Sequence, residues 1–535
     1  MRTPTRRTVL VSALAAAGTG LLAACSSGSD SMKGMDHSAM SHGSTSPAAA
    51  PAGFVAPNGP EVAAAEARRK PGPERKVALT ATETTLDLGG HTVRSWAYGD
   101  RLPGQEVRAT LGDTLALTLA NHLPQPTSLH WHGLALRNDM DGVPGVTQEA
   151  IRAGAAFDYR FALSHPGTYW LHPHSGVQQD RGLYAPLIVE DPKEPLRYDK
   201  EWVVVLDDWV EGVDGSTPDA VLAELAKGMG GMDHSSHSMP GMDMGGATPT
   251  AAAAPTAAAG PSRMLMGAAS PLLGGDAGDV AYPFHLVNGR LPSAPETFTA
   301  KPGDRIRIRL INAGGDTAYR VALGGHELTV THTDGFPVEQ ATTQALLLGM
   351  GERYDVLVTV KDGVFPLTAL AEGKNAGALA VLRTGGGAAP EASVRPAELD
   401  GRLLTAGQLK ADASVRLPAK APDRTVRLEL TGGMAKADWA FNGRRYDPAQ
   451  RYPVAAGERV RLEFRNSTSM WHPVHLHGHS FALGADGPRK DTAIVLPGAT
   501  LAVDFDADNP GLWMVHCHNV YHSETGMMTV LGYQA

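Results

Sequence analysis

The sequence predicts an all-β protein made of many short strands, and two features of the chain support this. Glycine and proline are abundant, at 61 and 38 residues, whereas aromatic residues make up only 6% of the chain. Such a composition is typical of short strands joined by frequent turns. Apolar and polar side chains also alternate at residues 114–119 and 305–310, and residues 354–358 are predicted to form a further strand. Alternation with a period of two indicates half-buried strands.

The length of the chain indicates several consecutive domains. A chain of 535 residues corresponds to three or four domains. We place the first at residues 76–192, the second at 200–385 and the third at 395–535. Residues 212–278 interrupt the second domain without a core pattern, so we expect a mobile surface loop there. The net charge of −9 is spread without a basic block, which argues against a nucleic acid partner.

The N-terminus has the features of an export signal. Arg6 and Arg7 precede an apolar run that is too short for a transmembrane helix, and they resemble a twin-arginine signal. The sequence ending at Cys25 resembles a bacterial lipobox, in which the cysteine is lipidated; the alternative is an ordinary cleaved signal. We therefore expect residues 1–25 to be a twin-arginine lipoprotein signal and residues 26–75 a disordered tether containing Met and His. The exported protein would be lipid-anchored to the cell membrane or periplasmic.

One segment near the C-terminus predicts a copper site. Cys517 lies between His516 and His518, and His522 and Met527 follow. Because alternate side chains on a strand face opposite ways, Cys517 points to one face and its two neighbours point to the other. One thiolate, two imidazoles and a distant methionine form a blue-copper electron-transfer site. This segment supplies three of those four ligands.

Three further segments supply the remaining imidazoles. Each contains a His-x-His pair whose members share one face of a strand: His130 and His132, His172 and His174, and His475 and His477. His472 lies an odd number of residues from the last pair, so it faces the other side and can join Cys517. With His516 and His518, the pairs make eight imidazoles at one centre, too many for a single ion. Since imidazole suits copper, a cluster of copper ions is predicted.

These four segments, in this order, resemble the multicopper oxidases over residues 76–535. The resemblance implies four copper ions: one type 1, one type 2 and two type 3. As type 1 ligands it implies His472, Cys517, His522 and Met527. As type 2 ligands it implies His130 and His475, and as type 3 ligands His132, His172, His174, His477, His516 and His518. A chance set of histidines is the alternative, and it does not explain four matched segments.

The resemblance also implies a fold and a path for electrons. Each of the three domains would be a cupredoxin-like Greek-key β-sandwich. The type 1 copper would pass electrons through Cys517 and its neighbouring histidines to a trinuclear cluster that reduces dioxygen to water. Ligands at both ends of the chain imply that the first and third domains meet. The second domain contains the single histidines His285, His326 and His332, which we interpret as ordinary polar residues, so we expect no copper there.

Methionines are concentrated in two polar segments, residues 32–40 and 229–244. These segments contain Met32, Met35, Met40, Met229, Met232, Met239, Met242 and Met244. Neither has an apolar core for methionine to fill, and thioether prefers Cu(I), so copper binding is favoured over a solvated low-complexity loop. The pattern resembles the cuprous oxidases and copper-resistance oxidases of the family, in which Met-rich segments deliver Cu(I) to the type 1 site.

Two residues beside the type 1 ligands extend the resemblance to cuprous oxidases. Met470 lies two residues before His472, and Glu524 lies two residues after His522. Both are predicted to hold Cu(I), and simple packing is the alternative for Met470. Thr468 stands where a carboxylate is often found in the family, so the chain departs from the usual pattern there.

Reduction of dioxygen to two waters consumes four protons, so the cluster needs a local proton donor or relay. Asp141 matches the family aspartate that hydrogen-bonds near the type 2 copper; the alternative is a turn residue before Gly142. Some members carry a proton-relaying glutamate directly after the second type 1 histidine, where this chain has Ser523. Glu524 is the nearest replacement in the sequence.

The predicted function is a multicopper oxidase that oxidises Cu(I) to Cu(II) in copper tolerance and reduces dioxygen to water. An axial methionine such as Met527 tunes the blue site, and in this family it goes with lower potentials than Leu or Phe. One alternative is a laccase-like oxidase of phenols or amines; another is a copper-sequestering surface protein. We expect a monomer whose partners are dioxygen, the reducing substrate and, through the lipid, the membrane.

Overall fold

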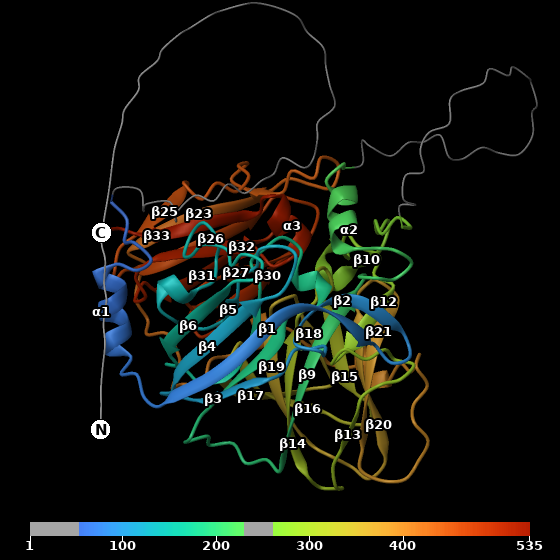
Figure 1. Ribbon diagram of the computed structural model, residues 1–535. Coiled ribbons are helices and arrows are strands. Elements are labelled where there is room, and N and C mark those ends of the chain that lie inside the picture. The colour runs from blue at the N-terminus through green and yellow to red at the C-terminus, as the bar shows by residue number, and fades with distance from the viewer. Residues whose placement is uncertain (1–52, 229–259) are drawn as a thin grey trace, which may run out of the picture. The chain divides into compact units, whose positions relative to one another are not determined.

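The computed structural model describes residues 53–228 and 260–535, which form three β-sandwiches in sequence order (Figure 1). The predicted signal with Cys25, the first Met-rich segment and all of residues 229–244 lie outside these described residues. Within the described residues, no helix is both long and apolar enough to span a lipid bilayer.

The first domain contains two four-stranded sheets. One consists, in spatial order, of β2 (Thr92–Tyr98), β1 (Glu74–Asp87), β4 (Thr114–Asn121) and β6 (Ala156–Ala162). The other consists of β3 (Val107–Thr110), β8 (Ala185–Glu190), β7 (Gly167–His172) and β5 (His130–His132).

The second domain contains two six-stranded sheets. One consists of β12 (Phe284–Val287), β9 (Lys200–Trp209), β14 (Arg305–Asn312), β19 (Arg353–Thr359), β16 (Leu328–Thr333) and β17 (Phe336–Thr343). The other consists of β13 (Thr297–Thr299), β21 (Ala376–Arg383), β20 (Val364–Ala371), β15 (Tyr319–Leu323), β18 (Ala345–Leu348) and β22 (Leu403–Leu404). A small ribbon of β10 (Ala269–Ser270) and β11 (Gly275–Asp276) lies outside both sheets.

The third domain contains a six-stranded and a five-stranded sheet. The larger consists of β24 (Ala440–Phe441), β23 (Arg424–Thr431), β26 (Arg459–Asn466), β31 (Thr500–Asp506), β28 (Phe481–Ala482) and β29 (Arg489–Lys490). The smaller consists of β25 (Arg451–Val454), β33 (Met528–Tyr533), β32 (Leu512–Cys517), β27 (His472–Leu476) and β30 (Thr492–Val495). The prediction of three cupredoxin-like Greek-key sandwiches is confirmed.

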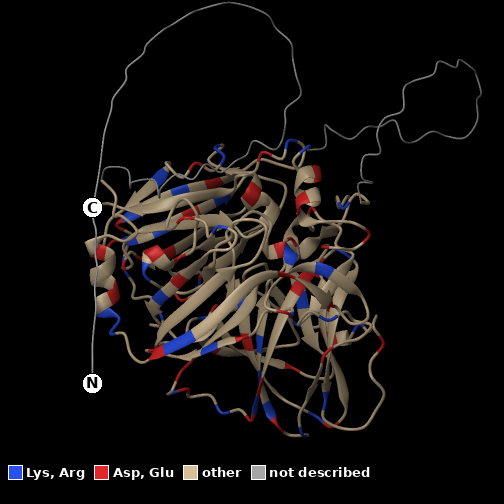
Figure 2. Ribbon diagram, in the orientation of Figure 1, with Lys and Arg blue, Asp and Glu red and all other residues tan. Residues whose placement is uncertain are grey.

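One continuous apolar core joins the first and third domains. Leu117 and Trp131 of the first domain and Phe464 and Val515 of the third belong to the same buried cluster. The second domain has a core of its own, built around strands such as β14 and β19. The first and third domains therefore meet, as the distribution of the His-x-His pairs implied. Acidic and basic side chains are interspersed over the described chain without a single-sign block (Figure 2).

Strand β14 differs from its predicted half-buried state. Its alternating arginines were expected to face solvent, but Arg307 and Arg309 are only 2% and 3% exposed. Both guanidinium groups contact Asp355, at 2.5 and 3.0 Å, and Arg309 also donates to Thr168 of the first domain. The arginine-bearing face of β14 is thus buried against a neighbouring strand and the first domain, and ion pairs compensate its charges.

The predicted tether over residues 26–75 is wrong from residue 53 onward. Helix α1 (Pro60–Arg68) buries Val62 and Ala65, which lie on one face because they are three residues apart. Arg69, directly after the helix, donates to Asn509 of the third domain at 2.8 Å. The Ala- and Pro-rich composition suggested disorder, but tertiary contacts order this segment.

The predicted boundary of the third domain at residue 395 is also wrong. Strand β22 pairs with β18 of the second domain, and Ala411 bridges Val338. Leu399, Leu404 and Leu409 are buried against the second domain. These apolar side chains extend the second domain past residue 400, and the first strand of the third domain begins only at Arg424.

The flanks of the predicted mobile loop over residues 212–278 are ordered. On the N-terminal side, helix α2 (Pro218–Leu225) begins at Thr217, whose side chain accepts a hydrogen bond from the Ala220 amide. Val221 and Leu225 belong to the same buried apolar cluster as Val520 and Tyr521 of helix α3 (Val520–Thr525) in the third domain. On the C-terminal side the chain returns by pairing with residues 279–281. Only the central part of the predicted loop lies outside the described residues.

Candidate metal centre

Strand pairing brings the histidine segments together two by two. Strand β5 pairs with β7, which sets His130 opposite His172. Strand β27 pairs with β32, which sets His475 opposite His516. Because side chains alternate along each strand, the paired His-x-His segments project from the same face of each sheet. The common core of the first and third domains then brings the two sheets to one centre.

Cys517, His472 and His522 form one compact group. The Cys517 Sγ atom lies 3.6 Å from the Nδ1 atoms of both histidines, which are 3.1 Å from each other. All three side chains and Met527 are fully buried. The Cys517 amide donates to the Met527 carbonyl at 3.0 Å, so the backbones of these two residues lie side by side. A thiolate, two imidazoles and a methionine are the donor set of a blue-copper site.

The eight other predicted histidines form a second group with the nitrogen spacing of a metal cluster. One set of three with ligand atoms within 4.8 Å is His132, His172 and His518, and a second is His174, His477 and His516. His130 and His475 complete the group and join a third set with His132. Two ring pairs stack across the interface of the first and third domains with centroids 3.8 Å apart, His130 on His477 and His132 on His475.

The hydrogen bonding of these rings fits copper. Six rings have a buried Nε2 atom without a hydrogen-bond partner among the described residues: His130, His172, His174, His475, His477 and His516. In five of these rings the Nδ1 atom has an oxygen partner. Four of the partners are backbone carbonyls: that of Asp141 for His130, of Pro173 for His172, of Asp491 for His475 and of Cys517 for His516. The fifth is the Asp141 side-chain atom Oδ2, which pairs with His477. A ring that donates from one nitrogen presents a lone pair on the other, which is the usual arrangement of a metal-binding histidine. Unpartnered buried nitrogens are costly, so their convergence indicates a metal.

Burial favours the neutral form, which metal ligands require, in most of these imidazoles. Burial, followed by repulsion from neighbouring rings, lowers the pKa of His172, His174 and His477 well below the usual value. In the other group, burial and then the His522 ring lower the pKa of His472. His522 differs, because the Asp279 carboxylate outweighs the effect of burial and raises the pKa of this ring to about 10.

Two carboxylates contact the second group. Asp141 Oδ2 accepts from His477 Nδ1 at 2.9 Å, and its backbone carbonyl accepts from His130. Asp491 Oδ1 lies 3.2 Å from His132 Nε2, and its carbonyl accepts from His475. Asp141 was predicted from its sequence motif, whereas Asp491 was not. The signal that could have found it is a carboxylate directly before Thr492, which pairs with His475.

Two further residues contact the first group. Thr468 Oγ1 lies 2.8 Å from His472 Nε2, so the threonine occupies the place of the expected carboxylate. Asp279 of the second domain lies 2.7 Å from His522 Nε2 through its Oδ2 atom. Sequence reasoning missed Asp279, because it is more than 200 residues from His522 and carries no motif. Trp439 packs on the His522 ring with centroids 4.1 Å apart.

The two described residues that were predicted to bind Cu(I), Met470 and Glu524, lie in different surroundings. Met470 is only 2% exposed and packs in the common core. Glu524 lies on α3, where burial raises its pKa to about 7, followed by the nearby charge of Asp219. In the described part of the chain Glu524 makes no hydrogen bond to any of the eight clustered histidines. It follows His522 of the Cys517 group by two residues on the same helix, and its role as a proton donor stays a prediction.

The single histidines of the second domain have protein partners. His285 Nδ1 lies 2.7 Å from the Tyr319 hydroxyl, and His326 Nε2 accepts from the Lys361 amide at 3.0 Å. His332 lies 3.1 Å from the Thr331 hydroxyl. They agree with the interpretation as ordinary polar residues.

The fold and these two groups define a copper protein built for electron transfer. Comparisons identify its family: three models described as multicopper oxidase match residues 80–194, 201–387 and 419–534. The chain is 46% identical to multicopper oxidase MmcO of Mycobacterium tuberculosis over 88% of this chain and 89% of that protein. It is 28% identical to a copper resistance protein A homolog of Pseudomonas syringae pv. tomato, over 84% and 90%.

A solved multi-copper oxidase from Pseudomonas thermotolerans has the same fold, with a TM-score of 0.62 and 27% identity over 86% of this chain and 99% of that one. The chain belongs to the multicopper oxidase family and is a copper-dependent oxidoreductase.

Proposed function

We propose that this chain is a cuprous oxidase that converts Cu(I) to Cu(II) in copper tolerance and reduces dioxygen to water. Its relatives include copper resistance proteins, which supports the role. The observation that carries the proposal is the position of the ordered flanks of the Met-rich segment, beside the group of Cys517, His472 and His522.

Both flanks of the Met-rich segment are attached near His522. Before the segment, helix α2 packs on α3, the helix that contains His522. After the segment, Leu265 donates to the Asp279 carbonyl at 2.7 Å, and Met264 bridges Val280. Asp279 in turn contacts His522 at 2.7 Å. The chain thus enters and leaves the Met-rich segment next to a type 1 ligand, where captured Cu(I) would be needed.

Asp279 supports electron entry at His522. Its Oδ2 atom faces His522 Nε2, while its Oδ1 atom has no partner among the described residues. A buried carboxylate oxygen at this position attracts a cation. We therefore propose that Cu(I) gives its electron to the type 1 centre on the Asp279 side.

We propose four copper ions with the ligands implied by the sequence. The type 1 ligands are His472, Cys517, His522 and Met527; the type 2 ligands are His130 and His475. The type 3 ligands are His132, His172 and His518 for one ion and His174, His477 and His516 for the other, which matches the two groupings in the fold. Copper bound there supplies one-electron oxidation at the type 1 site and four-electron reduction of dioxygen at the cluster.

Residues of this chain can connect the type 1 group to the cluster and hold a proton for the reduction of dioxygen. Cys517 is covalently joined to His516 and His518, so one residue of backbone links the type 1 group to each type 3 set. Asp141 contacts two cluster histidines, and we propose that it holds a proton for the reaction.

The remaining proposals concern location and assembly. We propose export by the twin-arginine pathway, lipid attachment at Cys25, and a monomeric protein outside the cytoplasm. The support is the sequence of residues 1–25, which lie outside the described chain.

The experiment replaces the five methionines of residues 229–244 by leucine, which keeps volume and removes the thioethers. Oxygen uptake is measured with Cu(I) and with a phenol at equal copper loading. We expect the rate with Cu(I) to fall about tenfold, because loss of groups that support a metal site lowers affinity or activity by at least this factor. The rate with the phenol should stay unchanged. Deletion of residues 247–258, which contain no methionine, is the control. Equal rates of the leucine variant and the parent with Cu(I) would contradict the proposal and favour a laccase-like oxidase.

A further inference from the structure

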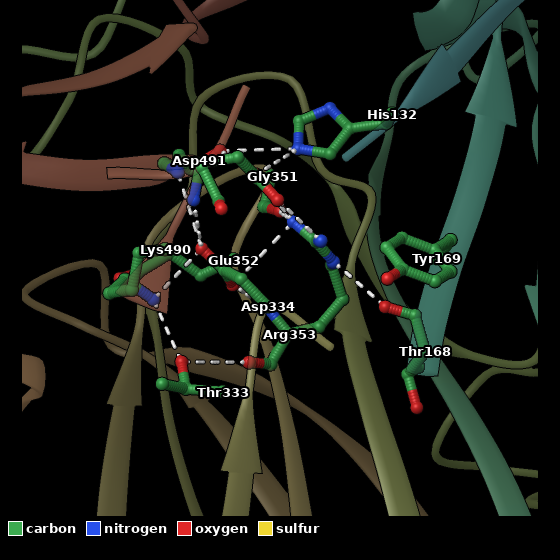
Figure 3. Close-up of polar contacts among 12 residues, drawn as sticks. His132, Thr168, Tyr169, Thr333, Asp334, Gly351, Glu352, Arg353, Lys490 and Asp491 are labelled. Atoms are coloured by element: carbon green, nitrogen blue, oxygen red, sulfur yellow. Dashed lines mark hydrogen bonds and ion pairs between the residues drawn. The ribbon is translucent and has the colours of Figure 1, made fainter. Parts of the chain in front are cut away.

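The second domain supplies none of the clustered histidines, yet three of its consecutive residues reach them. Gly351 and Glu352, which directly precede β19, and Arg353, the first residue of that strand, lie beside His132 and the segment around Asp491 (Figure 3). The first domain supplies His132 and the third supplies Asp491, so all three domains meet at this point.

Arg353 holds the Asp491 carboxylate with both ends of its guanidinium group. Nη1 donates to Asp491 Oδ1 at 2.7 Å and Nη2 donates to Oδ2 at 2.6 Å. The remaining Nε donates to the Thr168 carbonyl of the first domain at 3.1 Å. Arg353 and Asp491 are fully buried. A bidentate pair of this kind fixes the plane of the carboxylate as well as its position.

The fixed carboxylate determines which nitrogen His132 presents to the cluster. Asp491 Oδ1 lies 3.2 Å from His132 Nε2, and the Thr492 hydroxyl lies 3.1 Å from the same atom. His132 therefore presents its Nδ1 atom, which lies 3.2 Å from His518 Nε2. This orientation is opposite to that of the six rings that present Nε2. The backbone of Asp491 also orients a second ring, since its carbonyl accepts from His475 Nδ1 at 2.9 Å.

A second buried ion pair holds the backbone on which Asp491 sits. Asp334 Oδ2 accepts from the amides of Asp491 and Thr492 at 3.1 and 3.2 Å, and Asp334 Oδ1 accepts from the Arg353 amide at 2.9 Å. Lys490 contacts Asp334 at 3.1 Å and Glu352 at 3.0 Å (Figure 3). Two cations and three carboxylates are thus packed together at no more than 1% exposure.

Such a network is a poor way to gain stability alone. Removing charges from water is costly, and apolar residues of similar volume usually serve stability as well or better. The feature that apolar residues would not reproduce is the directed hydrogen bonding to His132 and to the 491–492 backbone.

Gly351 also packs closely against the clustered histidines. Its φ is +84°, and a Cβ atom there would lie 2.9 Å from His518 Cδ2 and 3.0 Å from His132 Cε1. The second domain therefore packs directly on two rings that belong to the same type 3 set.

We propose that Arg353 is a positioning residue for the trinuclear cluster: through Asp491 it fixes His132 with Nδ1 toward the metal and orients His475. The second domain thus fixes the relative positions of a ligand from the first domain and a ligand from the third. The inference rests on the proposed assignment of the eight histidines to copper.

The test compares the holoenzyme of Arg353→Lys with that of Arg307→Lys. Lysine keeps the charge but cannot contact both carboxylate oxygens in a fixed plane. Arg307 is an equally buried arginine of the second domain that pairs with Asp355 and Glu194. Copper content, the blue type 1 band, the type 2 electron paramagnetic resonance signal, the type 3 absorption and the melting temperature are measured for both.

For Arg353→Lys we expect an intact blue band, an altered type 2 signal and a loss of cluster copper affinity of about 10- to 100-fold, the usual effect of removing a group that orients a metal ligand. Arg307→Lys should keep both cluster signals at any melting temperature. Normal cluster signals in Arg353→Lys would overturn the inference, and so would parallel loss of type 1 and cluster copper in both variants.

Gly351→Ala provides an independent variant that replaces none of the ion-paired side chains. Should Arg353→Lys fail to fold, an altered type 3 signal with an intact blue band in Gly351→Ala supports the inference, and an unaltered one overturns it. A parent protein without type 2 and type 3 signals would instead refute the proposed copper assignment.

Discussion

Asp141 and Asp491 each join a histidine of the first domain to a histidine of the third. Asp141 contacts His130 and His477, whose rings stack at 3.8 Å. Asp491 contacts the other stacked pair, whose centroids are also 3.8 Å apart. The two carboxylates differ in their remaining contacts. Arg353 occupies both oxygens of Asp491, whereas Asp141 Oδ1 lies 3.2 Å from His130 Nδ1 without forming a hydrogen bond.

This difference leads to a prediction for Asp141. Asp141→Asn keeps the shape and one acceptor but removes the proton-holding group, so oxygen reduction should slow by about 10²- to 10⁴-fold. The blue band should remain, because Asp141 does not contact the type 1 group. Oxygen uptake at matched copper content is the measurement. Asp139→Asn is the control, since Asp139 pairs with Arg137; a normal rate for Asp141→Asn would exclude the proton role.

Cys517→Ser should remove the intense blue absorption and all oxidase turnover. Cys517 is the only cysteine in the described chain and the only thiol within reach of His472 and His522. Serine is smaller and a poor copper ligand, so the apo fold should survive with a small change in melting temperature. Absorption spectra and circular dichroism check both parts. A blue band in the pure variant would show that the type 1 assignment is wrong.

Stability should fall with decreasing pH in part because of His285. Burial, followed by the charge of Lys374, lowers the pKa of this ring from 6.5 to about 3. The folded state therefore resists a proton that the unfolded chain accepts below pH 6.5. The stabilisation is complete above pH 6.5 and is lost progressively toward pH 3, by about 1.4 kcal/mol per pH unit at most.

The check is the free energy of unfolding of holoenzyme against pH for His285→Gln, which removes the titrating ring. Its slope between pH 6.5 and 4 should be shallower than that of the parent by about one proton. His122→Gln, at an exposed position, is the matched control and should leave the slope unchanged. Identical slopes for parent and His285→Gln would contradict the prediction.

Cys25→Ala should release the protein from washed membranes if export is unaffected. The prediction depends on lipid attachment at that thiol. Fractionation with an antibody against the folded domains measures it. Retention in the membrane fraction after the substitution would indicate another anchor.

Much of the metal centre could be predicted because its signal is local. The period of two along a strand separates Cys517 from His516 and His518, and it separates His472 from His475 and His477. The order of the segments then implied the meeting of the first and third domains. The stacking of His130 on His477 and of His132 on His475 agrees with this expectation.

The partners of the ligands could not be predicted in the same way. Asp279, Arg353 and Asp491 belong to no motif, and their contacts with His522 and His132 depend on how whole domains pack. The order of helix α1 was missed for a related reason. Its composition favours disorder, and burial of Val62 in the common core and the hydrogen bond of Arg69 to Asn509 stabilise it.

The sequence by itself determined the family, the all-β fold and the face of each strand from which a copper ligand projects, since these follow from residue type and local backbone geometry. Only the tertiary structure decided which nitrogen each histidine presents and which carboxylate retains an oxygen without a hydrogen bond. It also decided where the ends of the Met-rich segment lie. The physical reason is that hydrogen-bond partners and burial come from residues distant in the chain, which are brought together only when the domains pack.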